Sequence, residues 1–231
     1  MADAADEPIF ALHGPAWRPG PAESLRLLAV GQGAIFLLTS PPGMAGPSRL
    51  HRYSVATGET EELELARTSG TPSGLFADPH SGASLIVSYG SGDNVYVHRA
   101  RSRVLGKAKG LLITAVAWLR PDPSRAETRD VLLGTSTGAI YDAALEPART
   151  TRYRQVFSLS PAAPIFGLQA EVFSPGGQNG HAAPATERRR LFVMAATPTR
   201  YYEFVGPASA ELLFAEYRDI SQLGYVEVRN T

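Results

Sequence analysis

The chain contains no cysteine among its 231 residues. Disulfide bonds, thiol nucleophiles and thiolate-ligated zinc are therefore excluded within it, which fits a reducing compartment. An excess of charge of one sign is also missing, because 22 Lys and Arg balance 22 Asp and Glu. A formally neutral chain has no long-range field that would attract nucleic acid or anionic lipid, so we expect no nucleic-acid partner.

Long hydrophobic runs are absent as well. No stretch approaches the roughly 18 apolar residues that a membrane-spanning helix needs. The first ten residues, MADAADEPIF, are acidic and lack the apolar centre of a secretory signal. We therefore expect a cytoplasmic protein without a transmembrane segment, associated with membranes only peripherally and through partners.

Four segments of the chain repeat one pattern: an apolar run, a Ser or Thr, a tight polar turn, and a second strand with an aromatic residue or a histidine. The apolar runs open at Ile35, Leu85, Val131 and Leu191, which lie 50, 46 and 60 residues apart. A period of about 45 residues built from short strands is typical of β-propeller blades. We therefore predict an all-β fold: a partial, WD40-like β-propeller with about four four-stranded antiparallel blades and the start of a fifth.

The predicted organisation is an irregular N-terminal arm at 1–20, followed by an incomplete propeller over 21–231. The expected blades cover approximately 25–65, 73–107, 111–159 and 165–217. The segment 174–187 is rich in Gly, Pro and Ala, and we expect it to be a mobile surface loop. It also accounts for the longest repeat step, since insertions into repeats fall in loops.

The end of the chain is the least regular part of the pattern. ELLFAEY (211–217) is expected to be the last strand of the fourth blade, although its composition suits a short helix equally well. GYVEV (224–228) is expected to open a fifth blade. Because an open propeller exposes unpaired strand edges, this count suggests the N-terminal piece of a larger protein.

One stretch matches a catalytic motif. Gly134–Gly138, GTSTG, fits the G-x-S-x-G of a hydrolase nucleophile elbow, which needs a helix directly after the motif. Here the strand-like AIYDAAL follows, and the only later histidine is His181, inside the expected loop. The favoured interpretation is a hairpin turn. The alternative is a propeller hydrolase or lyase that uses Ser136, Asp93 or Asp142.

Other candidate residues favour structure over chemistry. The histidines are not spaced as metal ligands, and His51 and His98 occupy corresponding strand positions. No phosphate-binding glycine motif occurs. The sequence therefore predicts no catalytic, metal or cofactor residue and leaves the partner-binding residues undetermined. The five histidines are His13, His51, His80, His98 and His181.

Two further groups have a structural and a functional interpretation. Tyr96, Tyr141 and Tyr202 recur at one repeat position, where packing between blades is favoured over anchoring a partner. Arg188, Arg189 and Arg190 precede an aggregation-prone strand. A charged gatekeeper is favoured there over a patch for phosphate or an acidic partner.

The ordered set of segments in the second half resembles the vacuolar protein sorting-associated protein 18 (Deep orange) family. The resemblance is densest from about residue 111 onward, and no single motif carries it. Its segments are VLLGTSTGAIYDAALE (131–146), PIFGLQAE (164–171), RYYEFVGPAS (200–209), LLFAEYRD (212–219) and QLGYVEV (222–228), with DEPIF (6–10) and VAWLR (116–120) nearer the N-terminus.

The resemblance implies the N-terminal propeller of a subunit of the HOPS and CORVET tethering complexes. Such a subunit acts in vesicle docking and fusion at late endosomes, lysosomes or the vacuole. Its implied partners are the other tethering subunits and, indirectly, Rab GTPases or SNARE proteins. The function expected from the sequence is thus a non-catalytic interaction scaffold. A WD40-like adaptor of another trafficking pathway is the alternative.

Overall fold

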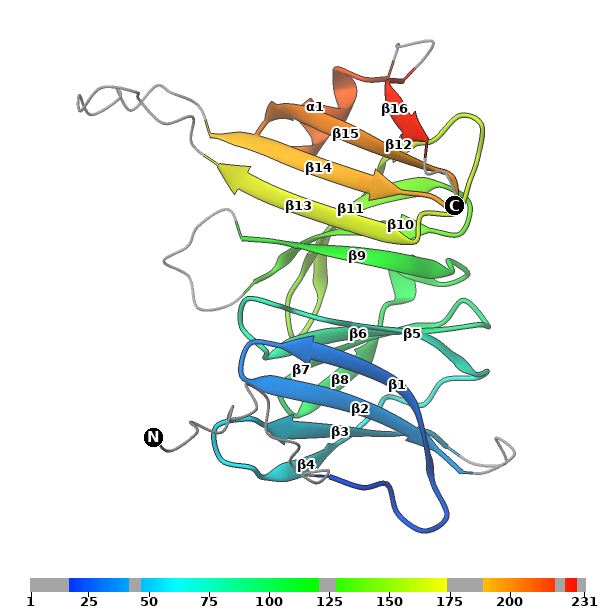
Figure 1. Cartoon of the computed structure of the whole chain (residues 1–231), viewed down its shortest axis with the longest axis vertical. Helices are drawn as coiled ribbons and strands as arrows, with labels where there is room; N and C mark the ends of the chain where they lie inside the picture. Colours follow the sequence, from blue (N-terminus) through cyan, green and yellow to red (C-terminus); the bar gives the residue numbers. More distant parts are fainter. Residues whose placement is uncertain (1–16, 42–46, 121–127, 174–188, 219–222, 228–231) are drawn as a thin grey trace, which may run out of the picture.

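The computed structural model describes residues 17–41, 47–120, 128–173, 189–218 and 223–227. Most of the expected arm and the whole of the expected loop at 174–187 lie outside these residues. Within the described part, the chain forms four antiparallel sheets of four strands each. The sheets are stacked in chain order (Figure 1), and the strands of each sheet are also in sequence order. This is the arrangement of β-propeller blades.

The first half of the chain forms the first two sheets. Sheet A consists of β1 (Ser24–Gly31), β2 (Ala34–Ser40), β3 (Arg49–Ser54) and β4 (Thr60–Leu63). Sheet B consists of β5 (Pro72–Ala77), β6 (Ser84–Tyr89), β7 (Asn94–His98) and β8 (Arg101–Val104), followed by a short 3-10 turn at Gly106–Ala108.

The second half forms the other two sheets. Sheet C consists of β9 (Ile113–Leu119), β10 (Asp130–Thr135), β11 (Ala139–Leu145) and β12 (Thr150–Ser158). Sheet D consists of β13 (Gly167–Phe173), β14 (Arg190–Ala196), β15 (Arg200–Pro207) and β16 (Tyr225–Glu227). Helix α1 (Ala210–Ala215) lies between β15 and β16 in the chain.

The last sheet corrects two expectations from the sequence. The segment 211–217 is not a strand: Ala210, Leu213 and Phe214 are buried on one side of α1, at the spacing of a helix. The segment 224–228 does not open a fifth blade, because Tyr225 pairs with Tyr202 and completes sheet D. Helix α1 therefore packs in the core where the sequence predicted a strand. The fourth strand of sheet D is β16, which follows the helix in the chain.

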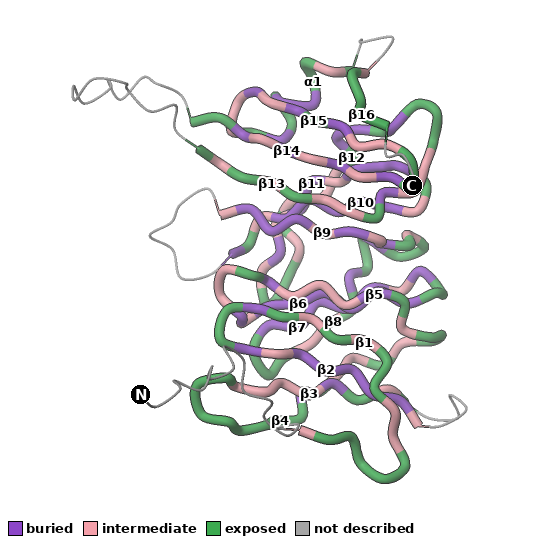
Figure 2. The backbone as a smooth tube through the Cα atoms, in the orientation of Figure 1, coloured by how far each residue is buried: buried purple, intermediate pink, exposed green. Residues whose placement is uncertain are grey.

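Three hydrophobic cores join the four sheets, each made from the alternate residues of two facing sheets. Phe36 and Leu38 of sheet A meet Leu85 and Val87 of sheet B. The neighbouring residue Ile86 points the other way, into the core between sheets B and C. This period of two follows from the pleat of a strand. Figure 2 shows that buried residues are concentrated on the middle strands of the sheets, such as β2 and β6.

The turns and linkers at one rim also fasten neighbouring sheets. Asn94 is fully buried, and the two N–H groups of its Nδ2 are shared among the carbonyl oxygens of Gly92, Ala108 and Leu111, at 3.1, 2.9 and 2.9 Å. Gly92 adopts φ +82, and its carbonyl accepts a hydrogen bond from the N–H of Gly110 at 2.9 Å. The hairpin turn of sheet B is therefore held against the linker that leads into sheet C.

The first strand of each sheet is its inner strand, meaning the strand that contacts the first strand of the neighbouring sheet near the axis of the stack. β1 contacts β5, β5 contacts β9, and β9 contacts β13. Sheet A extends downward from β1 in Figure 1 and sheet D upward from β13, while sheets B and C recede behind β5 and β9. The four sheets therefore form a fan around one side of an axis, with its two end sheets on the open side.

Candidate functional site

The GTSTG segment is the hairpin turn between β10 and β11. Ser136 and Thr137 lie in the turn, and β11 starts at Ala139. The hydroxyl of Thr135 donates to the carbonyl of Ala139 at 3.1 Å and accepts from its N–H at 3.0 Å. Two hydrogen bonds of the Thr135 side chain therefore stabilise the turn. The turn joins two antiparallel strands, whereas a nucleophile elbow joins a strand to a helix.

We expect the substitution Ser136→Ala to change the free energy of unfolding by less than about 0.5 kcal/mol, because the Ser136 side chain lies in a partly exposed turn. Urea unfolding followed by circular dichroism would measure this. Ester hydrolysis should be the same for both proteins. A turnover that disappears with Ser136→Ala would instead support the hydrolase alternative.

Asp93, a candidate acid, lies in the turn after β6. It accepts hydrogen bonds from the backbone N–H and the hydroxyl of Ser69, at 3.3 and 3.0 Å, and from the Ser91 hydroxyl at 3.3 Å. Hydrogen bonds from the Ser69 backbone and side chain lower the pKa of the Asp93 carboxyl below its usual value. Asp93 is therefore an ionised acceptor that orders the turn.

Asp142, the second candidate acid, belongs to an ionic network between sheet C and α1. Its carboxylate is 4% exposed and lies 2.7 Å from Nε of Arg152. Arg152 also pairs with Asp130 at 2.6 Å. Arg154 lies 3.6 Å from Asp142 and 2.6 Å from Glu211 of α1. The network thus fixes the helix onto sheet C and satisfies a buried carboxylate.

The two histidines at corresponding strand positions have different surroundings. His51 lies on the outer face of sheet A, where Nε2 is 3.4 Å from the Thr39 hydroxyl and the ring is 5.3 Å from that of Trp17. His98 is buried, with Nδ1 2.9 Å from the hydroxyl of Ser84. Among the described residues, no three His, Asp or Glu side chains are grouped to hold a metal ion.

Two of the three recurring tyrosines lie in the cores between sheets. Tyr96 is buried between sheets B and C, with the Arg103 guanidinium 5.3 Å from its ring centre. Tyr202 is buried between sheets C and D. Tyr141 is half-buried and stacks on Tyr153 at 5.2 Å. The favoured interpretation, packing rather than an exposed anchor, fits these positions.

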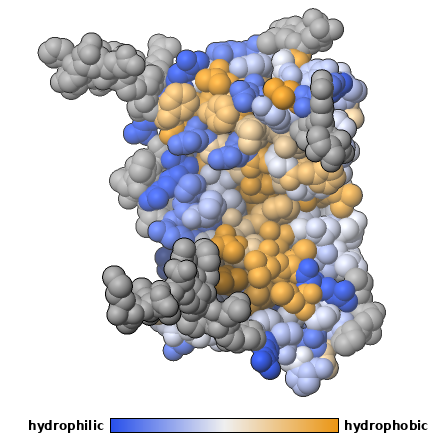
Figure 3. Space-filling model, in the orientation of Figure 1, coloured by the Kyte–Doolittle hydropathy of each residue, from blue (hydrophilic) through white to orange (hydrophobic). Residues whose placement is uncertain are grey.

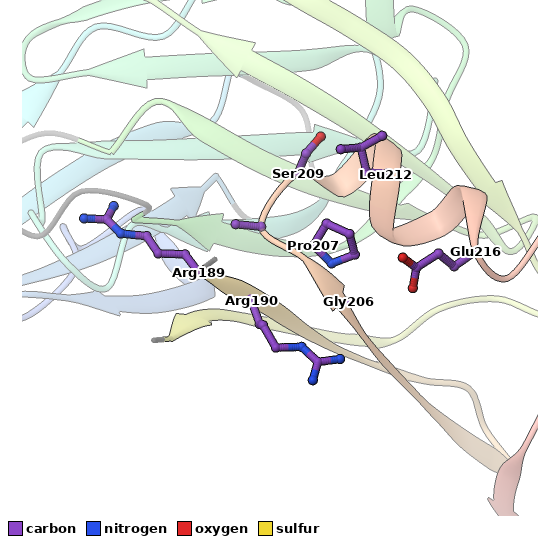
Figure 4. A pocket seen from close by; sticks show the side chains of 8 residues that line it. Arg189, Arg190, Gly206, Pro207, Ser209, Leu212 and Glu216 are labelled. Atoms are coloured by element: carbon purple, nitrogen blue, oxygen red, sulfur yellow. The ribbon is translucent and has the colours of Figure 1, made fainter. Parts of the chain in front are cut away.

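The arginines before β14 line an open hollow of about 660 Å³. Besides Arg189 and Arg190, the lining includes Pro207, the cross-strand neighbour of Arg190, together with Leu212 and Glu216. Figure 4 shows that the two arginine side chains extend in different directions, while Leu212 comes from α1 and Glu216 directly follows that helix. Arg188 lies outside the described residues. The hollow thus offers two cations and one carboxylate beside apolar surface, a composition suited to contacts with another molecule.

The four stacked, four-stranded sheets of the described chain place it in the class of β-propeller proteins. None of the described helices is long and apolar enough to cross a membrane. The chain belongs to the family described as the Pep3/Vps18/deep orange beta-propeller domain, which matches residues 25–223. The resemblance seen in the sequence is thereby confirmed.

Two curated relatives agree with this family. The chain is 31% identical over 178 residues to vacuolar sorting protein 18 of Arabidopsis thaliana, a match that covers 73% of this chain. It is 27% identical over 176 residues to the vacuolar protein sorting-associated protein 18 homolog of Danio rerio, with 70% of this chain covered. Each match spans 17% of the relative's length.

One solved structure that the chain partly matches is the beta-propeller domain of Cps50 (Swd1) from Myceliophteria thermophila. It has 13% sequence identity to this chain and a TM-score of 0.43. The match covers 83% of this chain and 53% of that domain.

Proposed function

We propose that the chain is a non-catalytic protein-interaction scaffold in vacuolar or lysosomal sorting, contributing the propeller part of a HOPS- or CORVET-type tethering subunit. The observation that supports this most directly is the family match over residues 25–223. In this role the chain acts at the cytoplasmic side of late endosomes, lysosomes or the vacuole, bound there through partner proteins. Vesicle docking and fusion are the processes that such a scaffold serves.

The structure supports a scaffold in physical terms. The candidate nucleophile Ser136 lies in a hairpin turn, and the candidate acids Asp93 and Asp142 are occupied by structural hydrogen bonds and ion pairs. The described surface instead offers cationic and apolar groups, such as Arg190 and Leu212, on rigid elements. Exposed side chains of this kind are suited to contacts with protein partners.

Binding to purified tethering subunits tests the proposal. We expect the labelled full chain to bind a HOPS-type subunit set with a dissociation constant in the micromolar range or below, measured by fluorescence anisotropy. A double substitution, Arg189→Glu with Arg190→Glu, tests whether the hollow beside α1 takes part. The control is the charge swap Arg149→Glu with Glu146→Arg at the ion pair of the β11–β12 turn, which keeps the net charge; the Arg149 side chain is 75% exposed and that of Glu146 is 31% exposed.

The outcome separates the proposal from its alternative. Binding to tethering subunits, and not to coat or ciliary-transport subunits, supports the tethering role. The reverse preference would assign the chain to a different trafficking pathway as a WD40-like adaptor. Failure to bind any member of the tethering set would contradict the proposal whatever the effect of the arginine substitutions.

A further inference from the structure

The outer end of sheet B carries a run of positive charge in a chain that is neutral as a whole. Residues 94–120 contain six Lys and Arg residues and no Asp or Glu. Four of the six lie in β8 and in or directly after the 3-10 turn that follows it, and we call them the basic edge: Arg101, Arg103, Lys107 and Lys109. Hydrophobic side chains gather elsewhere, over the inner strands of the lower sheets on the face that Figure 3 draws.

Carboxylates do not neutralise the basic edge. Among the described residues, none of the ion pairs includes Arg101, Lys107 or Lys109, and all three side chains are exposed. Arg103 donates from its guanidinium to a neutral acceptor, the carbonyl oxygen of Glu146, at 2.9 Å. The positive charges therefore add up along this edge.

The outer strands of the two neighbouring sheets are different. Glu61 of β4 pairs with Arg52 at 3.0 Å, and Arg152 of β12 pairs with Asp142 at 2.7 Å. At the basic edge the described carboxylate that interacts electrostatically with a cation is Asp93, which acts on Lys109 at one end. Of these three outer strands, β8 is thus the one that keeps an excess of positive charge.

The backbone of β8 offers unpaired hydrogen-bonding groups along the same edge. β8 is the last strand of sheet B, and within the described chain it pairs with β7 alone. The N–H of Leu105 donates to the carbonyl of Asn94 at 2.7 Å. Because bonded and non-bonded pairs alternate in an antiparallel ladder, every second residue counted back from Leu105 bonds to β7. The N–H and C=O groups of Ser102 and Val104 therefore point outward.

We propose that the basic edge is a docking site for an extended, acidic peptide segment of a partner protein, which adds to sheet B as a fifth strand beside β8. Main-chain hydrogen bonds to Ser102 and Val104 supply affinity. Acidic side chains opposite Arg101 and Arg103 supply specificity, because cross-strand neighbours share one side of a sheet. The same cations repel another basic strand, so the edge selects its partner by charge.

A strand fits this site better than a membrane surface does. The cations follow one strand and one turn, and the exposed large hydrophobic residue of β8 is Val104, which is 39% exposed. Binding in a membrane interface needs a broad apolar face beside the cations, whereas strand addition needs an unpaired edge. The basic edge is separate from the hollow beside α1, and the inference does not depend on the tethering role.

Fluorescence anisotropy with the full chain and a labelled peptide, Glu-Val-Glu-Thr-Glu-Val, tests the proposal. Its acids alternate, so that all three lie on one side of a strand. We expect saturable binding with a dissociation constant in the micromolar range, weakened by added salt. The peptide Glu-Glu-Glu-Val-Thr-Val has the same composition without the alternation, and we expect it to bind at least about tenfold more weakly.

Val104→Pro tests the role of the backbone. Proline removes the outward N–H of residue 104 and leaves the hydrogen bonds between β7 and β8 in place, as proline does on edge strands. We expect the dissociation constant to rise at least about tenfold. Val104→Thr is the matched control, because it keeps the N–H and the side-chain shape, and it should stay within about twofold of the wild type. Circular dichroism should show both variants folded.

Arg101→Glu with Lys107→Glu tests the role of charge, and we expect this double variant to lose measurable binding. Arg18→Glu with Arg26→Glu is the control, since it makes the same change in net charge at two exposed residues before or within β1. Several results would overturn the proposal: no binding of the alternating peptide, equal binding by Val104→Pro and Val104→Thr, or equal losses in the two charge variants. Binding to vesicles of phosphatidylserine and phosphatidylcholine without binding to the peptide would overturn it as well.

Discussion

Phe204→Ala is expected to lower the free energy of unfolding by about 3–5 kcal/mol, the typical cost of removing a buried phenylalanine. Phe204 is 1% exposed and lies where sheet C, sheet D and α1 meet. Its ring centre is 5.2 Å from that of Phe157, 5.1 Å from Phe214 and 5.0 Å from Tyr217. Truncation would leave a cavity lined by aromatic rings. Because these rings also pack against one another, they cannot move to fill the cavity without losing other contacts.

Urea unfolding of the wild type and of Phe204→Ala would measure this change. Phe166→Ala is the matched control, because the Phe166 side chain is 62% exposed and its hydrogen bond to the carbonyl of Ala196 comes from the backbone N–H, which alanine keeps. The control should stay within about 0.5 kcal/mol of the wild type. Equal losses for the two substitutions would show that the packing of α1 between the sheets contributes little.

Gly92→Ala is expected to cost about 2–5 kcal/mol, because two effects add. The residue adopts φ +82, a conformation that costs an L-residue about 1–2 kcal/mol. A Cβ atom there would also lie 2.8 Å from Cα and 2.9 Å from the carbonyl carbon of Gly110. Because both atoms belong to the backbone of the linker into sheet C, the linker must shift, at an overpacking cost of about 1–3 kcal/mol.

Gly58→Ala separates the two effects. Gly58 adopts a similar φ of +72, but a Cβ atom there would meet only the Tyr53 hydroxyl, at an ordinary 3.9 Å. We therefore expect this variant to lose only the strain, about 1–2 kcal/mol, in the same unfolding measurement. If the two alanine variants lost the same stability, the close approach of Gly92 to the linker would not constrain the stack.

The repeat pattern predicted the fold because it reflects forces that act within a few residues. Alternating apolar residues, such as Leu85 and Val87 against Ile86, specify strands buried on both faces. Turn glycines such as Gly58 and Gly92 specify where the strands reverse. These signals place most of the strands, and through the repeat they also predict the stacking of the sheets.

The errors at the end of the chain have a clear physical origin. Ala210, Leu213, Phe214 and Tyr217 follow the i, i+3, i+4, i+7 spacing of a helix, a signal present in the sequence. The repeat pattern, however, predicts a fourth strand at that point. Only the pairing of Tyr225 with Tyr202 shows that the strand comes after the helix.

The candidate site was less predictable than the fold. The pairing of Asp142 with Arg152 follows from the β11–β12 hairpin, whereas the contact of Arg154 with Glu211 depends on how α1 lies against sheet C. No local pattern carries that information, because the partners are far apart in sequence and come together only through packing. Asn94 is a different case: its carbonyl partners lie within 17 residues, but they come together only when the turn of sheet B packs on the linker into sheet C.

The strict chain order of the strands has a consequence for how the molecule is assembled. Every hydrogen-bonded strand pair in the described chain joins sequence neighbours. During synthesis, which proceeds from the N-terminus, sheet A has all four of its strands before β5 is made. None of the four described sheets waits for a strand from a distant part of the polypeptide, so ordering can spread from one sheet to the next through short-range contacts. A genetic deletion or duplication of one such stretch would remove or add a whole blade without leaving any of these strands unpaired.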